Sequence, residues 1–194
     1  MGHPFRNPQD ILDLESKMPL DMALNSPTVY QRLCKTRDLY PNRPAVSFQL
    51  KSDANYKATT LSWSELTTKV TQAANLFRSL GVGPKDVVAY LLPTTHETLI
   101  TLMGGMTCGI VAPINPTLEP ESIAALLRET DAKVLVTLRA FPKTNVSDLA
   151  SQAVALSPNI KTVIELDLLP HLSGISRLIV PLIRPKIVLS ILLK

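Results

Sequence analysis

The 194-residue chain is long enough to bury one substantial core, and its 45% hydrophobic and 19% charged residues indicate a globular protein. Its net charge of +4 does not indicate nucleic-acid binding, because the whole excess lies after residue 167, in Arg177, Arg184, Lys186 and Lys194. Aromatic residues are scarce, which disfavours base stacking, and no stretch reaches the roughly 18 apolar residues that a membrane span needs.

The first third of the chain predicts an arm, a helix and a hairpin. Residues 1–27 are rich in proline and polar residues, so we expect an extended arm with at most one helical turn and no signal peptide. Residues 28–39 predict a helix, which prolines 41 and 44 stop. Two short runs, 45–50 and 56–61, flank a polar segment and predict a β-hairpin.

The helix signal is most complete after the hairpin. Ser62 and Glu65 have the spacing of a capping box, in which each residue satisfies a free amide at the helix start. Gly81 is expected to end the helix with a positive φ. Between them, apolar residues recur every three or four positions and form one stripe: Leu66, Val70, Ala73, Phe77 and Leu80.

The centre of the chain alternates strand and helix. The expected strands are three apolar runs at 87–92, 110–114 and 134–137, and the expected helices lie between them at 96–105 and 121–129. Strands without polar alternation are buried on both faces, as in a parallel sheet covered by helices. We therefore predict an α/β fold with a doubly wound, mostly parallel sheet flanked by helices, plus the N-terminal arm and the short hairpin.

The chain after this unit predicts one more helix and one more strand. Asn145 is expected to cap a helix over 146–156, and residues 162–165 form a fourth candidate strand. Residues 168–194 predict a basic, apolar tail, in which Pro181 and Pro185 interrupt any long amphipathic helix. The expected division is thus an arm (1–27), an α/β body (28–167) and a tail (168–194).

Five segments, in the same order along the chain, resemble the N-terminal portion of AMP-forming acyl-CoA synthetases. They are LSWSEL at 61–66, LGVGPKDVV at 80–88, GGMTCGIVAPINP at 104–116, LEPE at 118–121 and DAKVLVT at 131–137. One position departs from the family's usual pattern, because Asp131 stands where relatives often carry a helix-ending glycine. Aspartate tolerates the left-handed conformation better than most residues, so we expect the turn to survive.

The resemblance implies a ligase that joins a carboxylic acid, such as a fatty acid, to coenzyme A with ATP and Mg²⁺. The family's phosphate-binding Ser/Thr/Gly loop, its distant lysine and its acidic magnesium partner do not occur in this sequence. The resemblance therefore implies the N-terminal portion of such an enzyme, which we expect to be inactive alone and to have the rest of its parent chain as a partner. The ligands expected for the whole enzyme are ATP, CoA and Mg²⁺.

Candidate binding residues follow the ends of two predicted strands. Asn115 and Pro116 follow the strand at 110–114, and Arg139 follows the strand at 134–137. In a doubly wound fold the functional crevice lies at the carboxyl ends of the strands. The resemblance places this edge beside the CoA nucleotide, where Arg139 could meet a phosphate. The alternative is that Arg139 is a solvated loop residue.

Other reactive residues form no recognisable set. His3, His96 and His171 stand in three dissimilar contexts, so no catalytic triad can be argued, and we expect His96 to be a polar residue in the first turn of a helix. Cys34 and Cys108 lack metal-ligand spacing, which indicates a reducing, cytoplasmic compartment. The glycines do not form a loop that follows a strand and opens a helix, as phosphate binding requires.

Two other function classes remain open at this point. One is a binding module that holds a nucleotide or CoA without catalysis. The other is a protein that uses the basic apolar tail at a membrane surface, although packing of the tail against further protein is the expectation we favour. The same apolar tail predicts that the chain self-associates.

Overall fold

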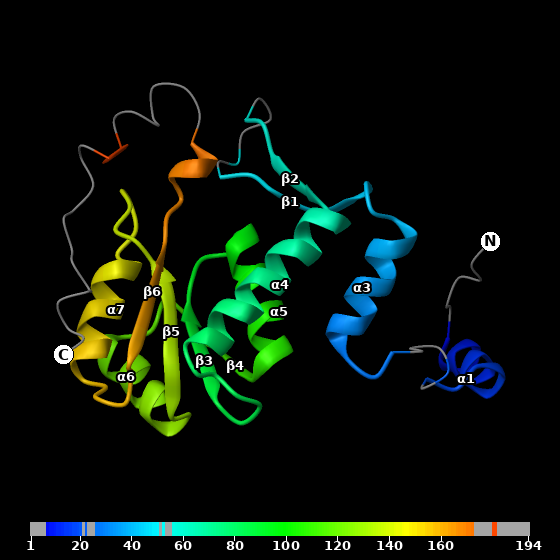
Figure 1. Ribbon diagram of the computed structural model, residues 1–194, viewed down its shortest axis with the longest axis horizontal. Coiled ribbons are helices and arrows are strands. Elements are labelled where there is room, and N and C mark those ends of the chain that lie inside the picture. The colour runs from blue at the N-terminus through cyan, green and yellow to red at the C-terminus, as the bar shows by residue number, and fades with distance from the viewer. Residues whose placement is uncertain are drawn as a thin grey trace.

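The computed structural model describes residues 7–20, 22, 26–50, 52, 56–172 and 180–181, and it has an α/β architecture (Figure 1). The helices are α1 (Pro8–Lys17), α3 (Val29–Leu39), α4 (Trp63–Ser79), α5 (His96–Cys108), α6 (Pro120–Glu129), α7 (Val146–Ala155) and the short 3₁₀ helix η1 (Leu169–His171). The strands are β1 (Pro44–Phe48), β2 (Thr59–Ser62), β3 (Val87–Leu91), β4 (Ile110–Pro113), β5 (Ala132–Leu138) and β6 (Thr162–Leu166).

The main sheet has four parallel strands in the order β4-β3-β5-β6. Ala89 on β3 lies beside Ala112 on β4 and Leu135 on β5, and Leu135 in turn lies beside Val163 on β6. The chain therefore leaves β3 toward one side and then returns to its other side, which is the doubly wound topology that the sequence predicts. That prediction of the fold class is confirmed.

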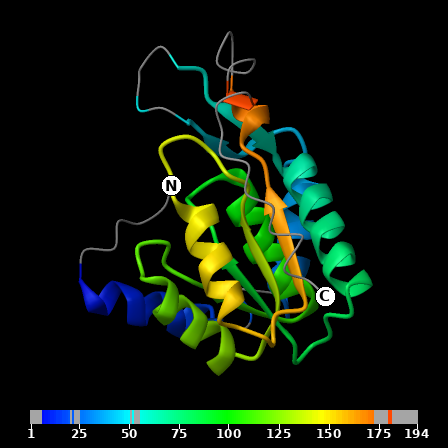
Figure 2. The same ribbon diagram turned by 90° about the vertical axis from the view of Figure 1, so that its left-hand side faces the viewer.

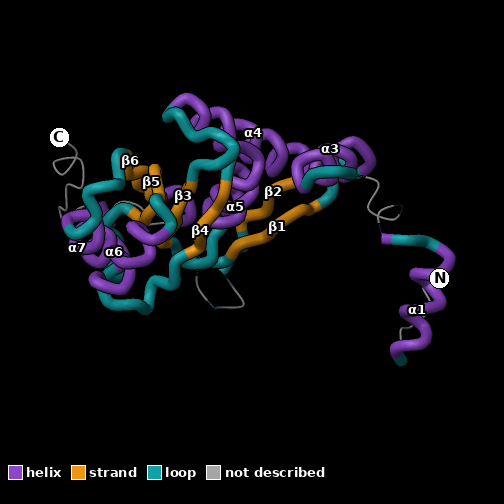
Figure 3. Tube along the Cα trace, turned by 90° about the horizontal axis from the view of Figure 1, so that it is seen from below, coloured by secondary structure: helices purple, strands orange, loops and turns teal. Residues whose placement is uncertain are grey.

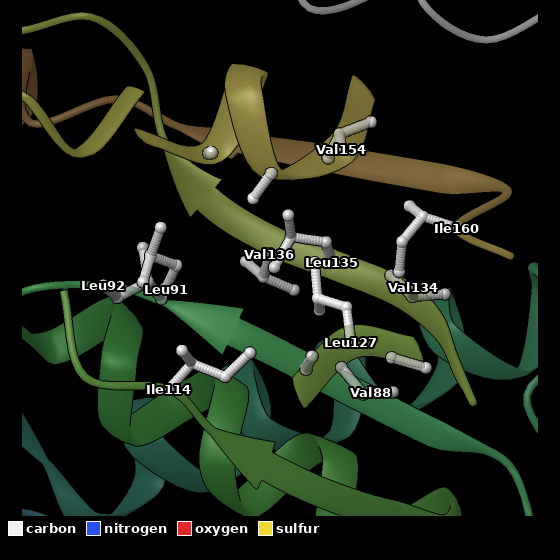
Figure 4. Packing of buried hydrophobic residues seen from close by; sticks show 14 of the residues in the cluster. Val88, Leu91, Leu92, Ile114, Leu127, Val134, Leu135, Val136, Val154 and Ile160 are labelled. Atoms are coloured by element: carbon white, nitrogen blue, oxygen red, sulfur yellow. The ribbon is translucent and has the colours of Figure 1, made fainter. Parts of the chain in front are cut away.

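Helices cover both faces of this sheet, as its apolar strands require. Helices α4 and α5 pack against each other on one side, and α6 and α7 pack against each other on the other (Figures 1 and 2). The central strand residues Val88, Ala89 and Leu135 have no exposed surface. Figure 4 shows Val88 and Leu135 among other buried side chains, which include Leu127 on α6 and Val154 on α7. Burial of each such valine or leucine side chain stabilises the fold by roughly 1.5–3 kcal/mol.

The local signals around α4 are confirmed. The Glu65 amide donates to Ser62 Oγ at 3.2 Å, and the Ser62 amide donates to Glu65 Oε2 at 2.8 Å, which completes the capping box. All five stripe positions face the core as the spacing predicts: Leu66, Val70 and Phe77 are buried, and Ala73 and Leu80 are partly buried against it. Gly81 ends this region with φ +81°.

The turn before β5 takes the conformation expected for it. Asp131 has φ 48°, so the left-handed position survives without a glycine. Lys143 has φ 64°, which the sequence did not indicate. Asn145 occupies the N-cap position of α7, but its side chain makes no capping hydrogen bond there. The amide of Val146 instead donates to Thr144 Oγ1 at 3.3 Å. The predicted cap position is therefore confirmed, but the side chain of Asn145 does not make the expected capping hydrogen bond.

Strands β1 and β2 form the predicted antiparallel hairpin, separate from the main sheet (Figure 3). Phe48 lies opposite Thr59, and the register shifts between Pro44 and Val46. A second, smaller apolar cluster joins this hairpin to α3, α4 and α5, with Leu33, Leu66 and Val70 buried at its centre.

The expectation of an extended N-terminal arm is wrong for residues 8–17, which form helix α1. Asn7 and Asp10 make a capping box, and Pro8 occupies a position where its missing amide costs nothing. The helix buries none of its residues: Ile11, Leu12 and Leu14 are between 46% and 57% exposed. It lies apart from the body in Figures 1 and 3.

Most of the predicted tail lies outside the described residues. Its first part is described through Leu172, and both Leu168 and Leu172 are buried. Across the described ranges, no helix is long and apolar enough to cross a membrane.

Candidate functional site at the carboxyl edge of the sheet

The parallel order places the segments that follow all four strands at one edge of the sheet. Asn115 and Pro116 follow β4, and Arg139 follows β5, but β3 lies between these two strands. The neighbour of β5 on the other side is β6, so Arg139 is placed beside the end of β6 instead. The predicted site residues therefore share an edge but do not form one adjoining set.

Asn115 organises the turn that leads from β4 to α6. Its Oδ1 accepts hydrogen bonds from the Thr117 amide at 3.0 Å and from the Thr117 hydroxyl at 2.9 Å. Asn115 is exposed and Pro116 is half-buried. The side-chain oxygen of Asn115 thus has a structural use as an Asx turn, in which an asparagine mimics the backbone.

Arg139 pairs with a carboxylate at the end of β6. Its Nη1 lies 3.8 Å from Asp167 Oδ2, and its side chain is 51% exposed. Asp167 Oδ1 also accepts the Leu169 amide at 3.0 Å, so the same carboxylate starts η1. An exposed pair of this kind contributes little stability. A phosphate that approached Arg139 would compete with the Asp167 carboxylate for the positive charge of the arginine.

These residues do not fit ATP phosphates with magnesium. Mg²⁺ in proteins prefers carboxylate oxygens together with the phosphates of its substrate. In the part of the chain that the structure describes, no three His, Cys, Asp or Glu side chains gather closely enough to hold a metal ion.

A cluster that the sequence did not reveal lies at the same edge, where β3 leads into α5. His96 is the first residue of α5 and is only 3% exposed. Thr95 is the cap of this helix, since its Oγ1 accepts the Thr98 amide at 3.3 Å. His96 is thus in the first turn of a helix as expected, but it is buried rather than solvated.

Three segments distant in sequence meet at His96. The Phe48 ring on β1 contacts the His96 ring with centroids 5.8 Å apart, and it contacts the His171 ring of η1 at 5.0 Å. The two histidine rings lie 5.7 Å apart. His171 Nε2 is 2.8 Å from Glu97 Oε1. We call His96, Glu97, His171, Phe48 and Thr59 the histidine cluster.

Further contacts tie η1 to the hairpin within this cluster. The Tyr56 hydroxyl donates to the His171 carbonyl at 2.9 Å. Thr59 Oγ1 lies 3.3 Å from His171 Nδ1 and donates to the Phe48 carbonyl at 3.3 Å. Burial and nearby charges both shift the pKa of a titratable side chain, so the environment of this cluster affects the pKa values of His96 and Glu97.

Burial and neighbouring charges shift two pKa values in the histidine cluster. Burial lowers the pKa of His96, and the nearby charges of His171 and Lys69 lower it further, against the opposite effects of Glu97 and the Val46 backbone. Burial favours the neutral form of Glu97. Hydrogen bonds from its own amide and from His171 outweigh that effect, so the pKa of Glu97 is lowered.

The sequence offered little signal for this cluster, because its members come from β1, β2, α5 and η1. Only the position of His96 just after a buried strand pointed toward this edge. The contacts that matter span 74 residues between Glu97 and His171 and 112 between Thr59 and His171.

A shallow groove of about 300 Å³ lies elsewhere, between the start of α3, the middle of α4 and the end of α5. Tyr30 and Thr71 are joined across it by a hydrogen bond of 2.7 Å between their hydroxyls. Its one cation, Arg78, donates to the Thr107 carbonyl at 3.2 Å. Among the described residues that line it, no two groups are suited to acid–base chemistry.

The fold matches that of the N-terminal domains of adenylate-forming enzymes, and comparison of the sequence shows the family. The AMP-binding enzyme family matches residues 35–177, and the chain belongs to that family. The resemblance predicted from the five segments is therefore confirmed.

Among relatives, the marinolic acid–CoA ligase of Pseudoalteromonas sp. (strain SANK 73390) is 35% identical over 154 residues. The match covers 79% of this chain but 23% of that ligase. The long-chain-fatty-acid–CoA ligase of Bacillus subtilis (strain 168) is 25% identical over 135 residues, which are 69% of this chain and 23% of that protein. This chain thus spans about a quarter of the length of these relatives.

Solved structures show the same fold. A Mycobacterium tuberculosis fatty acyl CoA synthetase superposes with a TM-score of 0.60 and 20% identity, over 72% of this chain and 26% of that one. Coronafacic acid ligase from Pectobacterium brasiliense gives a TM-score of 0.59 and 12% identity, over 70% of this chain and 25% of that ligase. At such identities the likeness concerns the fold alone.

Proposed function

We propose that this chain provides the N-terminal part of the large domain of an acyl-CoA ligase. The whole enzyme would join a carboxylic acid, such as a fatty acid, to CoA while converting ATP to AMP and pyrophosphate. The observation that carries the proposal is the match of the AMP-binding enzyme family to residues 35–177, together with 35% identity to a CoA ligase over most of the chain.

In this proposal the chain supplies the sheet and one wall of the crevice at its carboxyl edge. Arg139 would meet a phosphate of CoA after exchanging its contact with Asp167 for one with the ligand. Asn115 and Pro116 would shape the neighbouring part of the wall by fixing the turn into α6. The other partners of the active enzyme would be the remainder of the parent chain and the carboxylic acid.

We further propose that the chain alone does not form an acyl-adenylate. Adenylation requires that the charge of the β- and γ-phosphates be neutralised while a carboxylate attacks the α-phosphorus. Most of the rate in such sites comes from positive charges and backbone donors that are already in place. Arg139, half-exposed and paired with Asp167, cannot replace such a set.

The exchange of labelled pyrophosphate into ATP, dependent on added acid, tests this proposal. We expect background exchange from the chain alone across fatty and aromatic acids. If the reading frame continues beyond Lys194, the longer product should show acid-dependent exchange and form a CoA thioester. A frame that ends at Lys194, or robust exchange by the purified chain after contaminating enzymes are excluded, would contradict the proposal.

Binding of CoA tests the role of Arg139 separately. If the chain binds CoA in a titration, Arg139→Ala should weaken that binding. Arg37→Ala, which removes an arginine from helix α3 outside the proposed site, is the control and should not. Equal affinity of the two variants would remove Arg139 from the proposed site.

We place the protein in the cytoplasm, with Cys34 and Cys108 as free thiols in support. Contact of the basic tail with a membrane surface, and self-association through it, are tested by deletion of residues 178–194. Co-sedimentation with anionic vesicles measures membrane contact, and light scattering measures self-association. A property that depends on the tail should be lost when residues 178–194 are deleted.

A further inference from the structure

The histidine cluster joins the segment after β6 to the hairpin by polar contacts rather than by a broad apolar surface. His171 and the Tyr56 hydroxyl, the Thr59 hydroxyl and the Phe48 ring make up this junction. Without them, η1 would be held by Leu168, Leu172 and the Asp167 cap. The junction therefore depends on the protonation state of a few side chains.

The hydrogen bonds assign one N–H group of His171. The carboxylate of Glu97 can only accept, so His171 Nε2 donates to it. The Thr59 hydroxyl lies 3.3 Å from both the Phe48 carbonyl and His171 Nδ1, and its one hydrogen can be donated to either of them. His171 is thus held between Glu97 and Thr59.

The neighbouring His96 has the opposite requirement. It is 3% exposed, and its Nε2 atom is buried with no hydrogen-bond partner among the described residues. A proton added there would place a positive charge on a buried ring 5.7 Å from the ring of His171. Lys69 adds positive charge to this environment, and Glu97 is the carboxylate that opposes it.

We propose that His96, Glu97 and His171 form an acid-sensitive latch that holds residues 168–172 against the β1–β2 hairpin. Near neutral pH the latch is closed, with a neutral His96 beside the His171–Glu97 pair. On acidification His96 takes up a proton, the buried ring then needs solvent around its charge, and η1 leaves the hairpin. This opening does not depend on the proposed ligase function.

The direction of the effect follows from the burial of His96. The pKa of His96 is below its ordinary value of 6.5 in the folded protein, so the open form binds more protons than the closed form. The latch is then fully stable above about pH 6.5 and weakens as the pH falls through the lowered pKa. Glu97, whose pKa is also lowered, adds a further loss once the pH falls below its ordinary value of 4.5.

Hydrogen–deuterium exchange on the full 194-residue chain tests the latch. Peptides that cover η1 are compared at pH 7.5 and 5.0, after correction for the intrinsic pH dependence of exchange, with peptides from α7 as internal reference. We expect the amides of His171 and Leu172, which bond to Leu168 and Leu169, to lose at least roughly tenfold of their protection at pH 5.0. Protection that persists in η1, or a simultaneous loss in α7, would overturn the proposal.

The variant His96→Phe isolates the proton. Phenylalanine retains a ring against Phe48 but cannot take up charge, so η1 should stay protected at pH 5.0. Tyr56→Phe is the matched control, because it removes the bond to the His171 carbonyl without a titration in this range, and it should lower protection at both pH values alike. An acid-induced loss in His96→Phe equal to that of the natural chain would overturn the latch. If that variant does not fold, the comparison of η1 with α7 in the natural chain decides.

Discussion

Strand β3 connects two regions that are held together by different forces. Along its length Val88, Ala89 and Leu91 have no exposed surface and contact apolar side chains from both faces of the sheet. Just beyond its carboxyl end, His96 and Glu97 enter a small cluster in which rings, one carboxylate and hydroxyl groups meet. The sheet is stabilised by burial, which hardly depends on pH, whereas the cluster is stabilised by charges and hydrogen bonds, which do.

The difference separates what maintains the fold from what can change within it. Loss of an apolar side chain from the sheet should unfold the whole body. Loss of a charge from the histidine cluster should weaken one junction and alter its response to acid. Substitutions in the sheet and in the histidine cluster should therefore differ in the size of their effect on stability and in its dependence on pH.

The largest effect is expected from Leu135→Ala in the central strand β5. Leu135 has no exposed surface, so its truncation leaves a cavity between the helix layers and should lower the free energy of unfolding by about 2–5 kcal/mol. Urea denaturation measures the change. Leu156→Ala is the control, because Leu156 is 46% exposed, and its effect should be far smaller.

Glu97→Gln should have an intermediate effect that depends on pH. Its side chain is 26% exposed, and the loss of a charged hydrogen bond to His171 should cost about 1–3 kcal/mol at pH 7. Because the pKa of Glu97 is lowered by folding, its contribution is present above the ordinary value of 4.5 and is lost as the pH falls through the lowered pKa.

Urea denaturation of both proteins between pH 7.5 and about 3, which extends below the ordinary Glu97 pKa of 4.5, checks this pattern. The difference in stability between the natural chain and Glu97→Gln should shrink on the acid side. Asp38→Asn, which removes a carboxylate from an exposed pair with Arg37, should show little difference at any pH. A constant difference in stability over the whole pH range would mean that Glu97 contributes through packing, as the sheet residues do, and not through its charge.

Ser62→Ala should cost about 1 kcal/mol, because it removes the cap from α4. The effect tests whether a helix cap contributes to the stability of the apolar body as well as to the position of the helix start. Thermal or urea denaturation measures it, with Ser79→Ala near the other end of the same helix as control. A cost for Ser79→Ala as large as that for Ser62→Ala would show that the cap is not its source.

The smallest effect, and one of opposite sign, is expected from Asp131→Gly. Asp131 has φ 48°, which glycine adopts without a steric cost, so stability should rise by less than about 1 kcal/mol. The gain should be the same at pH 7.5 and 5, because Asp131 lies outside the histidine cluster. Destabilisation would mean that the aspartate side chain makes a contribution larger than its backbone strain.

Sequence patterns predicted the sheet well because its signals are local. The runs 87–92, 110–114 and 134–137 became β3, β4 and β5, and Ser62 with Glu65 fixed the start of α4. Helix α1 was missed, although Asn7 and Asp10 already had the spacing of a capping box, because its apolar residues have no partner in the body.

The candidate site was predicted less completely, for a physical reason. The rule for strand ends correctly placed Asn115 and Arg139 at the carboxyl edge, but it could not show that Arg139 pairs with Asp167. His96 and His171 come together only through the return of the chain after β6 and the position of the hairpin. Such an arrangement depends on tertiary packing and leaves no periodic trace in the sequence.

Helix α5 also connects the two regions mechanically. A side chain at Gly104 would place its Cβ 2.7 Å from the Cβ of Ala73, and one at Gly105 would collide with Val111, so the last turns of α5 sit directly on α4 and β4. The helix has 13 residues and is about 20 Å long. The first turn of α5 carries His96 and Glu97. A bulkier residue at Gly105 should therefore shift or tilt the whole helix and displace both side chains from His171. A substitution remote from the histidine cluster could thus alter its response to acid without touching any of its members.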